Sequence, residues 1–307
     1  MSLFDNFVAV ILTTMTSFTS SIQGAPVPPV TQSEMTNVQV SINEAVEQSQ
    51  NEQMVSGVAI IDRAYNNRMK TGGFSHEPLS MQSLGRLPIL LYAVRVDDDV
   101  AKGEVPEIVE MVQGFSGDAT DAMWDKYGGN TILNDLTQRY NLQETKTGQS
   151  WSDAKMSAVD VGRLLRRFLD DNAISPKKKA WTMSLMRNTA MNASGNDFSF
   201  GLPSALNAQE SEQRLSWMQG WSGTGAANMV RSSVGVYGND MRYIVVVLGE
   251  VPPTTTDEDA NNKINLVTQK LVAGEPFYEE DEEEEKPKEF AEKQAKKFPN
   301  SVGSLQK

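Results

Sequence analysis

Residues 230–248, VRSSVGVYGNDMRYIVVVL, decide the fold of this chain. Two runs rich in β-branched and aromatic residues, 230–237 and 242–248, flank a Gly238-Asn239-Asp240 turn. Such runs favour extended strands, and a short Gly/Asn/Asp segment between them is typical of a β-hairpin. The sequence therefore predicts a hairpin here, and residues 214–220 predict a further strand before it.

Strands are also predicted near the other end of the chain. Residues 55–62 and 67–72 have strand composition and flank an Ala-Tyr-Asn-Asn turn at 64–67, which predicts a second hairpin. An amphipathic helix is expected before it at 36–50, and another at 257–273 follows the last strand. The sheet must therefore be assembled from both ends of the chain.

The middle of the chain, from residue 87 to about residue 191, has a helical pattern. Helices are predicted at 87–96, 105–113 and 131–140, and the first of these is apolar on most sides. A fourth helix begins after Ser157, with Asp160 placed as in a capping box, and continues through 161–169. An antiparallel sheet flanked by N- and C-terminal helices, with an all-helical insertion, is an α+β fold.

The folded domain is expected to occupy residues 33–274, between two segments of different composition. Within it, 33–80 and 212–274 should form the α/β part and 81–211 the helical lobe. Residues 1–32 predict a leader and Pro-rich spacer, because nine apolar residues at 7–15 precede GAPVPP. This pattern indicates a secreted or cell-envelope protein without a membrane span after processing. Asp5 and the lack of an early basic residue also leave open a disordered cytosolic leader.

The C-terminal segment, residues 275–307, contains EEDEEEE and is expected to be an acidic, disordered tail. The whole chain of 307 residues has 28 Lys and Arg against 40 Asp and Glu, a net charge of −12. Without a basic patch, nucleic acid is excluded as a partner. With no Cys and a single histidine, His76, neither a thiolate nor a His-clustered metal site is expected, and no cofactor is predicted.

Three short segments carry candidate chemistry. The first is MQSLGRLP at 81–88, where Ser83 stands at the start of the most apolar helix. Helix N-terminal N–H groups favour a developing oxyanion at such a serine. The second segment is Ser116-Gly117-Asp118, and the third is WSGTG at 221–225, followed by Arg231.

The order of these elements resembles the serine β-lactamase and penicillin-binding-protein family, class A in particular. That family uses the motifs S-x-x-K, S-D-N and K-T-G, in a cleft between a five-stranded sheet and a helical lobe. The three segments above occupy the corresponding places, and the helix after the second ends in a Gly-Gly pair as in the family. The resemblance covers about residues 33–273 and implies a β-lactamase/transpeptidase-like fold.

The resemblance implies a catalytic group of Ser83, Arg86, Ser116 and Asp118. Ser83 corresponds to the nucleophile and Ser116 to the proton-relaying serine. The motif lysine is replaced by Arg86, whose guanidinium cannot accept the proton of Ser83 at neutral pH. Asp118 replaces an amide, and we expect it to form an ion pair with Arg86.

The resemblance also implies a binding group of Trp221, Ser222, Gly223, Thr224 and Arg231. Trp221 replaces the lysine of K-T-G, whereas Ser222 and Gly223 fit the motif. The Thr224 N–H would then be the oxyanion-hole donor. Arg231, like Arg86, is expected to anchor a ligand carboxylate.

One element of the family is missing from the sequence. Class A enzymes activate the deacylating water with a glutamate that has an asparagine four residues later. Residues 141–153 contain no such pair, and their only acids are Glu144 and Asp153. Deacylation by the class A route is therefore expected to fail.

Simpler structural roles remain open for the same residues. Ser83 could cap its helix while Arg86 reaches solvent, and Ser116 and Asp118 could cap the helix that follows them. Trp221 could be a core aromatic residue. His76 is expected to be an exposed loop residue.

Three functions follow from this sequence. The first is a secreted, catalytically impaired β-lactamase-like protein whose cleft binds a peptidoglycan-like or partner peptide. The second is an active serine hydrolase, a weak β-lactamase or D,D-peptidase acylated at Ser83 by a β-lactam. The third is an envelope scaffold that captures an envelope protein through its acidic tail.

Overall fold

The computed structural model describes residues 29–64, 67–187, 192–193, 196–206, 215–223 and 228–273. The chain divides into two compact units, residues 1–33 and 34–307, and the fold below is that of the second. The acidic tail, and the leader up to residue 28, lie outside the described residues. Helix α2 (Pro29–Asn51) begins seven residues before the expected start, with a proline in its first turn, where no N–H is needed.

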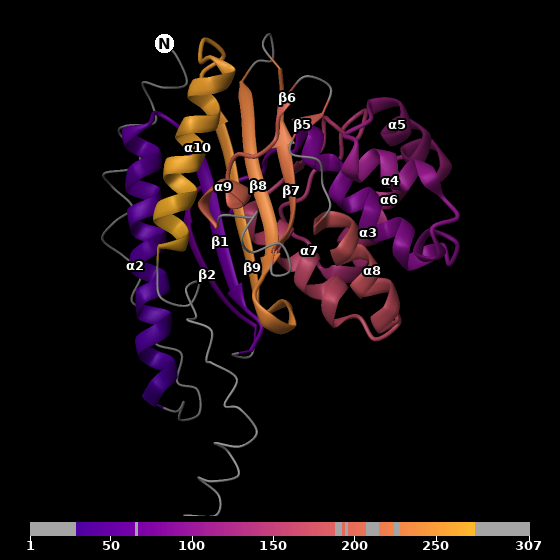
Figure 1. Cartoon of the computed structure of the whole chain (residues 1–307), viewed down its shortest axis with the longest axis horizontal. Coiled ribbons are helices and arrows are strands. Elements are labelled where there is room, and N and C mark those ends of the chain that lie inside the picture. Colours follow the sequence, from indigo (N-terminus) through magenta and orange to yellow (C-terminus); the bar gives the residue numbers. More distant parts are fainter. Residues whose placement is uncertain are drawn as a thin grey trace, which may run out of the picture. The chain divides into compact units, whose positions relative to one another are not determined.

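A five-stranded antiparallel sheet is the centre of this unit, as predicted (Figure 1). Its strand order is β2-β1-β9-β8-β7, so neighbouring strands come from both ends of the chain. The strands are β1 (Val55–Asp62), β2 (Arg68–Gly73), β7 (Leu215–Trp221), β8 (Met229–Tyr237) and β9 (Tyr243–Val251). The predicted hairpins are β1–β2 and β8–β9, and β7 forms the edge next to β8.

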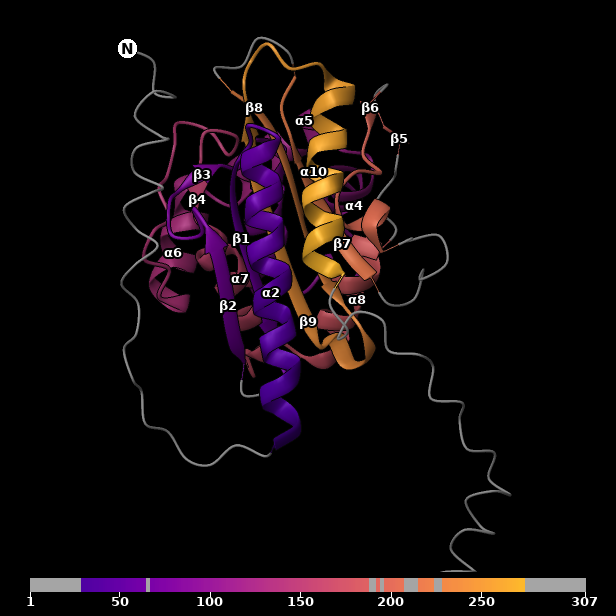
Figure 2. The same ribbon diagram turned by 90° about the vertical axis from the view of Figure 1, so that its left-hand side faces the viewer.

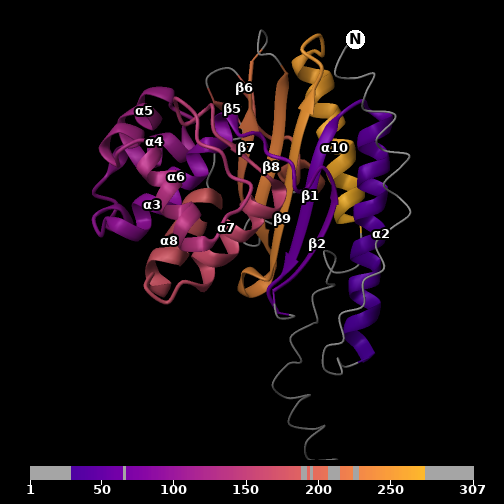
Figure 3. The ribbon, with the colours of Figure 1, turned by 180° about the vertical axis from the view of Figure 1, so that it is seen from behind.

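Helices cover both faces of the sheet. Helices α2 and α10 (Asp257–Val272) lie side by side against one face (Figure 2), together with the short α9 (Leu202–Ala205). The other face packs against the helical lobe, seen from behind in Figure 3. In β9, Val245 and Val247 belong to the apolar cluster that contains Ile264 of α10, whereas Ile244 and Val246 belong to the lobe cluster. The strand is consequently hydrophobic at almost every position.

The lobe follows the predicted order of helices. Its helices are α3 (Arg86–Val96), α4 (Pro106–Gln113), α5 (Gly117–Lys126), α6 (Asn130–Tyr140), α7 (Ala158–Asp170) and α8 (Pro176–Arg187). Short strands accompany them: β3 (Leu79–Ser80), β4 (Lys155–Met156), β5 (Asn192–Ala193) and β6 (Asn196–Asp197). The Ser157 cap of α7 is confirmed, because its Oγ accepts the Asp160 N–H at 3.0 Å. Among the described helices, none combines the length and apolar character that crossing a bilayer requires.

Candidate active site

Ser83 lies in the 3₁₀ turn η1 (Gln82–Gly85), which connects β3 to α3. Met81 directly precedes this turn, and its N–H holds the turn in place by donating to the carbonyl of Ala154 at 3.0 Å. Ser83 is 8% exposed. The residue that caps α3 is Gly85, so the alternative in which Ser83 caps this helix is wrong.

The hydroxyl of Ser83 bonds to the backbone of the edge strand β7. It accepts the Trp221 N–H at 2.7 Å and donates to the Gln219 carbonyl at 3.3 Å. Gly220 between them has no room for a side chain, because a Cβ there would lie 3.1 Å from the Cβ of Leu84. The strand N–H beside the serine therefore belongs to Trp221. Thr224, which we expected to supply it, lies outside the described residues.

Arg86 points into the protein and is 5% exposed, so the alternative in which it reaches solvent is wrong. Its Nε donates to Thr120 Oγ1 at 3.0 Å, and its terminal nitrogens donate to the carbonyls of Ser83 and Phe115 at 3.1 and 2.9 Å. Its guanidinium carbon lies 5.4 Å from the ring centre of Phe115 and 5.0 Å from that of Trp151. Arg86 is therefore held by neutral acceptors and two aromatic rings.

Arg86 cannot act as the missing base. Burial lowers the pKa of Arg86 to about 10, and the charge of Asp121 opposes this shift. A group with a pKa near 10 is neutral in only roughly one molecule in a thousand at pH 7. Among the described residues, both hydrogen-bond partners of the Ser83 hydroxyl are backbone groups, so no described side chain is placed to remove its proton.

The predicted ion pair between Arg86 and Asp118 is wrong. Asp118 is exposed in the first turn of α5, whereas Thr120, two residues later, is buried and accepts from Arg86. A spacing of two residues places side chains on different faces of a helix, which is why the carboxylate points away. The capping alternative for Ser116 is confirmed, because its Oγ accepts the Ala119 N–H at 3.1 Å.

The residues predicted to bind a ligand, as far as the structure describes them, also make mainly structural contacts. Ser222 Oγ accepts the Val230 N–H at 2.8 Å and so holds β7 to β8. The Trp221 ring lies edge-on to Phe198, 6.2 Å between centres, and belongs to the apolar cluster next to α10. Trp221 is therefore a partly buried core aromatic residue. Gly223 follows the strand, and a Cβ there would lie 3.2 Å from the Trp221 ring.

Arg231 is fully buried and does not serve as a free anchor for a ligand carboxylate, which corrects our expectation. Its guanidinium forms an ion pair with Asp257 of α10 and donates to Asn261 Oδ1 at 2.7 Å. It also donates to the Ser222 carbonyl at 3.0 Å. Burial lowers the pKa of Arg231, and Asp257 opposes this shift.

One residue of the candidate site, Trp151, was not predicted from the sequence. It lies in the loop at the place where the resemblance to class A enzymes leads us to expect an Ω-loop. Lys146 and Lys155 exchange two backbone hydrogen bonds of 2.8 and 2.9 Å and close residues 146–155 into a loop. Trp151 in this loop covers Arg86, and its Nε1–H donates to Asp121 at 2.7 Å. No local sequence signal distinguishes Trp151 from a core tryptophan, because its contacts lie 30 and 65 residues away.

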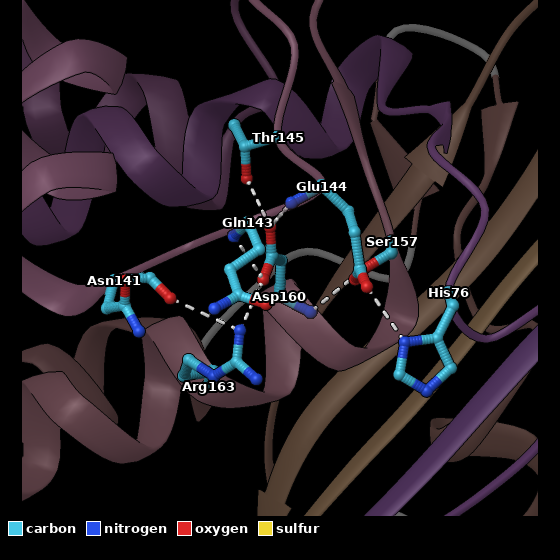
Figure 4. Close-up of polar contacts among 8 residues, drawn as sticks. All are labelled: His76, Asn141, Gln143, Glu144, Thr145, Ser157, Asp160 and Arg163. Atoms are coloured by element: carbon cyan, nitrogen blue, oxygen red, sulfur yellow. Dashed lines mark hydrogen bonds and ion pairs between the residues drawn. The ribbon is translucent and has the colours of Figure 1, made fainter.

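The two acids of residues 141–153 are engaged elsewhere. Glu144 accepts from Ser157 Oγ at 2.5 Å and lies 2.8 Å from Nδ1 of His76 (Figure 4). Asp153 accepts from Ser150. His76 is exposed, as predicted, with 66% of its side chain accessible. Neither acid is bonded to the Ser83 turn in the described part of the chain.

Buried Asp160 fastens residues 143–145, just before this loop, to α7. Its carboxylate accepts the backbone N–H groups of Gln143 and Glu144 and the hydroxyl of Thr145, and it forms an ion pair with Arg163 (Figure 4). The position of Glu144 is therefore fixed from both its backbone and its side chain.

We expect Glu144→Gln to destabilise the protein at pH 7 but not in acid. Burial raises the pKa of Glu144, but the bonds from Ser157 and His76 outweigh burial and lower it below 4.5. A lowered pKa stabilises the folded state above the ordinary value, and the benefit disappears as the pH falls through the lowered one. The expected loss is about 1–2 kcal/mol at pH 7. Urea unfolding from pH 7 to pH 3 checks this; a difference from wild type that grows in acid contradicts it.

Gln219 is a second buried polar side chain close to the serine. It is fully buried in β7, and both its Nε2 and Oε1 lack a hydrogen-bond partner among the described residues. Strand alternation places it between Trp217 and Trp221, on the face that packs against α10.

We expect Gln219→Met to raise the free energy of unfolding by roughly 1–3 kcal/mol, because it removes two unpaired polar atoms and keeps the volume. Gln219→Ala is the control, since it removes the same atoms but leaves a cavity, and should destabilise. Chemical denaturation measures both. A destabilised Gln219→Met protein would show that the amide is satisfied.

Comparisons with known proteins agree with this fold. The sequence profile of the "Beta-lactamase enzyme family" matches residues 118–274. The "Putative lipoprotein LppW" of Mycobacterium tuberculosis and that of Mycobacterium bovis are each 27% identical to this chain over 205 residues, which cover 62% of this chain. The match spans 61% of the length of these curated relatives.

Solved structures with the same fold include a class A beta-lactamase from Bacteroides cellulosilyticus and the protein PBP-A. The first has a TM-score of 0.62 at 12% identity and covers 78% of this chain and 98% of its own. The second has a TM-score of 0.60 at 16% identity, covering 77% and 95%. These matches confirm the predicted fold.

Proposed function

Because the chain belongs to the beta-lactamase enzyme family, we propose that it is a catalytically impaired member, which binds a ligand beside Ser83 without hydrolysing it. One observation carries this proposal: among the described residues, the Ser83 hydroxyl bonds only to strand backbone, while its neighbour Arg86 is a permanent cation. Serine acylation needs a base to accept the hydroxyl proton, and such assistance is worth about 10²–10⁴ in rate.

The second chemical step, hydrolysis of the acyl-serine, also lacks a suitable base among the described residues of the loop. Hydrolysis of an acyl-serine needs a base that activates water, and in the class A route this base is a carboxylate. Glu144 and Asp153, the acids of the replacing loop, are bonded to Ser157 and Ser150. The Trp221 N–H beside Ser83 favours the alternative of an active hydrolase, but a donor for an oxyanion does not replace a base.

The strand at which Ser83 lies supports the proposed ligand class. β7 is an edge strand, and an edge strand can recognise an extended peptide through its main-chain groups. A peptidoglycan-derived stem peptide or a partner peptide has the required extended amides. The lipoprotein names of the curated relatives support a location in the cell envelope, and the apolar leader supports export.

Titration calorimetry with a soluble peptidoglycan fragment that keeps its stem peptide tests this function. We expect the wild type and Ser83→Ala to bind it with similar affinity, and mass spectrometry to recover the fragment unchanged from both. Ser83→Ala is the matched control because it removes only the hydroxyl. Cleavage of the fragment by the wild type but not by Ser83→Ala contradicts the proposal.

We expect Arg86→Lys alone to produce no β-lactam turnover. Lysine restores a group able to lose its proton, but the deacylating carboxylate would still be missing. In absorbance assays with the chromogenic substrate nitrocefin, the variant should hydrolyse the substrate no faster than a blank without protein. Rapid hydrolysis by this single variant would show that the replacing loop supplies the second step after all.

A further inference from the structure

Among the described residues, the buried arginines are Arg86 and Arg231, and only Arg86 has no counter-ion there. Arg231 is equally enclosed, but Asp257 forms an ion pair with it. The acceptors of Arg86 are two carbonyls and one hydroxyl, all neutral, and no carboxylate in the described part of the chain forms an ion pair with it. A buried charge is costly unless an opposite charge accompanies it.

The hydrogen bonding of Arg86 is also incomplete. A guanidinium has five N–H groups, and the described residues accept from Arg86 through only three bonds. The nearest negative influence is Asp121, which is exposed and accepts the indole N–H of Trp151. The unused donors belong to a group that lies against the rings of Phe115 and Trp151.

We propose that Arg86 anchors the carboxylate of a small ligand, which enters beside Trp151 and supplies the missing counter-ion. This inference rests on the proposed function, since Arg86 also bonds to the carbonyl of Ser83. It names the charged group of the ligand and assigns its recognition to Arg86 rather than Arg231. A carboxylate accepts hydrogen bonds in the guanidinium plane, so it can use the two remaining N–H groups while Arg86 keeps its three existing bonds.

Of the groups that surround Arg86, we expect the Trp151 side chain to be the one that moves. The backbone of its loop is fastened by the Lys146–Lys155 bonds and by Asn130 Nδ2, which donates to the Gly148 carbonyl at 2.9 Å. The Trp151 carbonyl is wedged against Gly85, where a Cβ would lie 2.3 Å away. Its indole, in contrast, is only partly buried, packs against Arg86 and makes one hydrogen bond in the described part of the chain, to exposed Asp121. Rotation of this side chain therefore opens Arg86 without disturbing the loop.

Carboxylate probes with neutral counterparts test the site in the full chain. Acetate and N-acetylglycine are compared with acetamide and N-acetylglycinamide at constant ionic strength, by thermal shift and tryptophan fluorescence. We expect only the two carboxylates to raise the melting temperature, with a dependence on concentration that saturates. Tighter binding of N-acetylglycine than of acetate indicates a peptide carboxy terminus; equal binding indicates a general small carboxylate. Equal shifts for acids and amides overturn the proposal.

Two variants with opposite expected effects complete the test. Arg86→Lys, which keeps the charge but loses the planar fork, should weaken carboxylate binding at least about tenfold. Asp121→Asn, which removes the competing negative charge, should strengthen it several-fold. An unchanged affinity in both variants overturns the site. Acylation of Ser83 would instead overturn the proposed function, whereas a failure of carboxylates to bind, with Ser83 unmodified, overturns only this inference.

Discussion

Replacing Arg86 by alanine is expected to lower the free energy of unfolding by about 3–5 kcal/mol. The substitution leaves the buried carbonyl of Phe115 without the Arg86 donor, and an unpaired buried polar group costs roughly 1–3 kcal/mol, whereas the Ser83 carbonyl keeps the backbone N–H of residue 86. It also removes the guanidinium that lies against the rings of Phe115 and Trp151 and leaves a cavity beside them. Urea unfolding followed by far-ultraviolet circular dichroism measures the loss.

Arg167→Ala is the matched control for this prediction. Arg167 is an arginine on an exposed position of α7, and surface substitutions of that kind usually change stability by less than about 0.5 kcal/mol. A loss below about 1 kcal/mol in Arg86→Ala would mean that Arg86 is not held as described.

Removing the carboxylate of Asp257 is expected to cost about 3 kcal/mol, because Arg231 then remains buried without its counter-ion. Asp257→Ala is the variant, and its thermal and urea unfolding are the measurements. Asp257 also stands in the first turn of α10, where any acid interacts favourably with the helix dipole.

Glu258→Ala separates these two contributions, since Glu258 is an exposed acid in the same turn. It should cost at most about 1 kcal/mol. In the double variant Arg231→Met with Asp257→Ala, much of the lost stability should return, because replacing both charges by apolar groups is often tolerated. Equal losses in Asp257→Ala and Glu258→Ala would show that the ion pair contributes little.

The sequence predicted the architecture because its signals are local. β-branched runs, a Gly-Asn-Asp turn and the Ser157 cap define strands and helices over a few residues each, and the order of elements then indicated the sheet. The position of Ser83 before a buried helix and the inward direction of Arg86 follow from the same local pattern. α2 was the main difference, because its first turns contain few apolar residues.

The contacts of the site depend on distant residues and were harder to predict. The expected partner of Arg86, Asp118, points to solvent because Thr120 occupies the inward face of α5. Trp151 reaches Arg86 from a loop 65 residues later, which no pattern near either residue indicates. Arg231 was expected at a ligand, but its side chain lies on the sheet face that meets α10, where Asp257 accompanies it.

Intact-protein mass spectrometry after incubation with an excess of a β-lactam tests most directly whether Ser83 is a disarmed nucleophile. The hydroxyl is bonded to the backbone of β7, and no basic side chain in the described part of the chain is bonded to it, so we predict that the mass of the wild-type protein equals its untreated value. A stable adduct with the mass of one β-lactam, present in the wild type and absent from Ser83→Ala, would contradict this account.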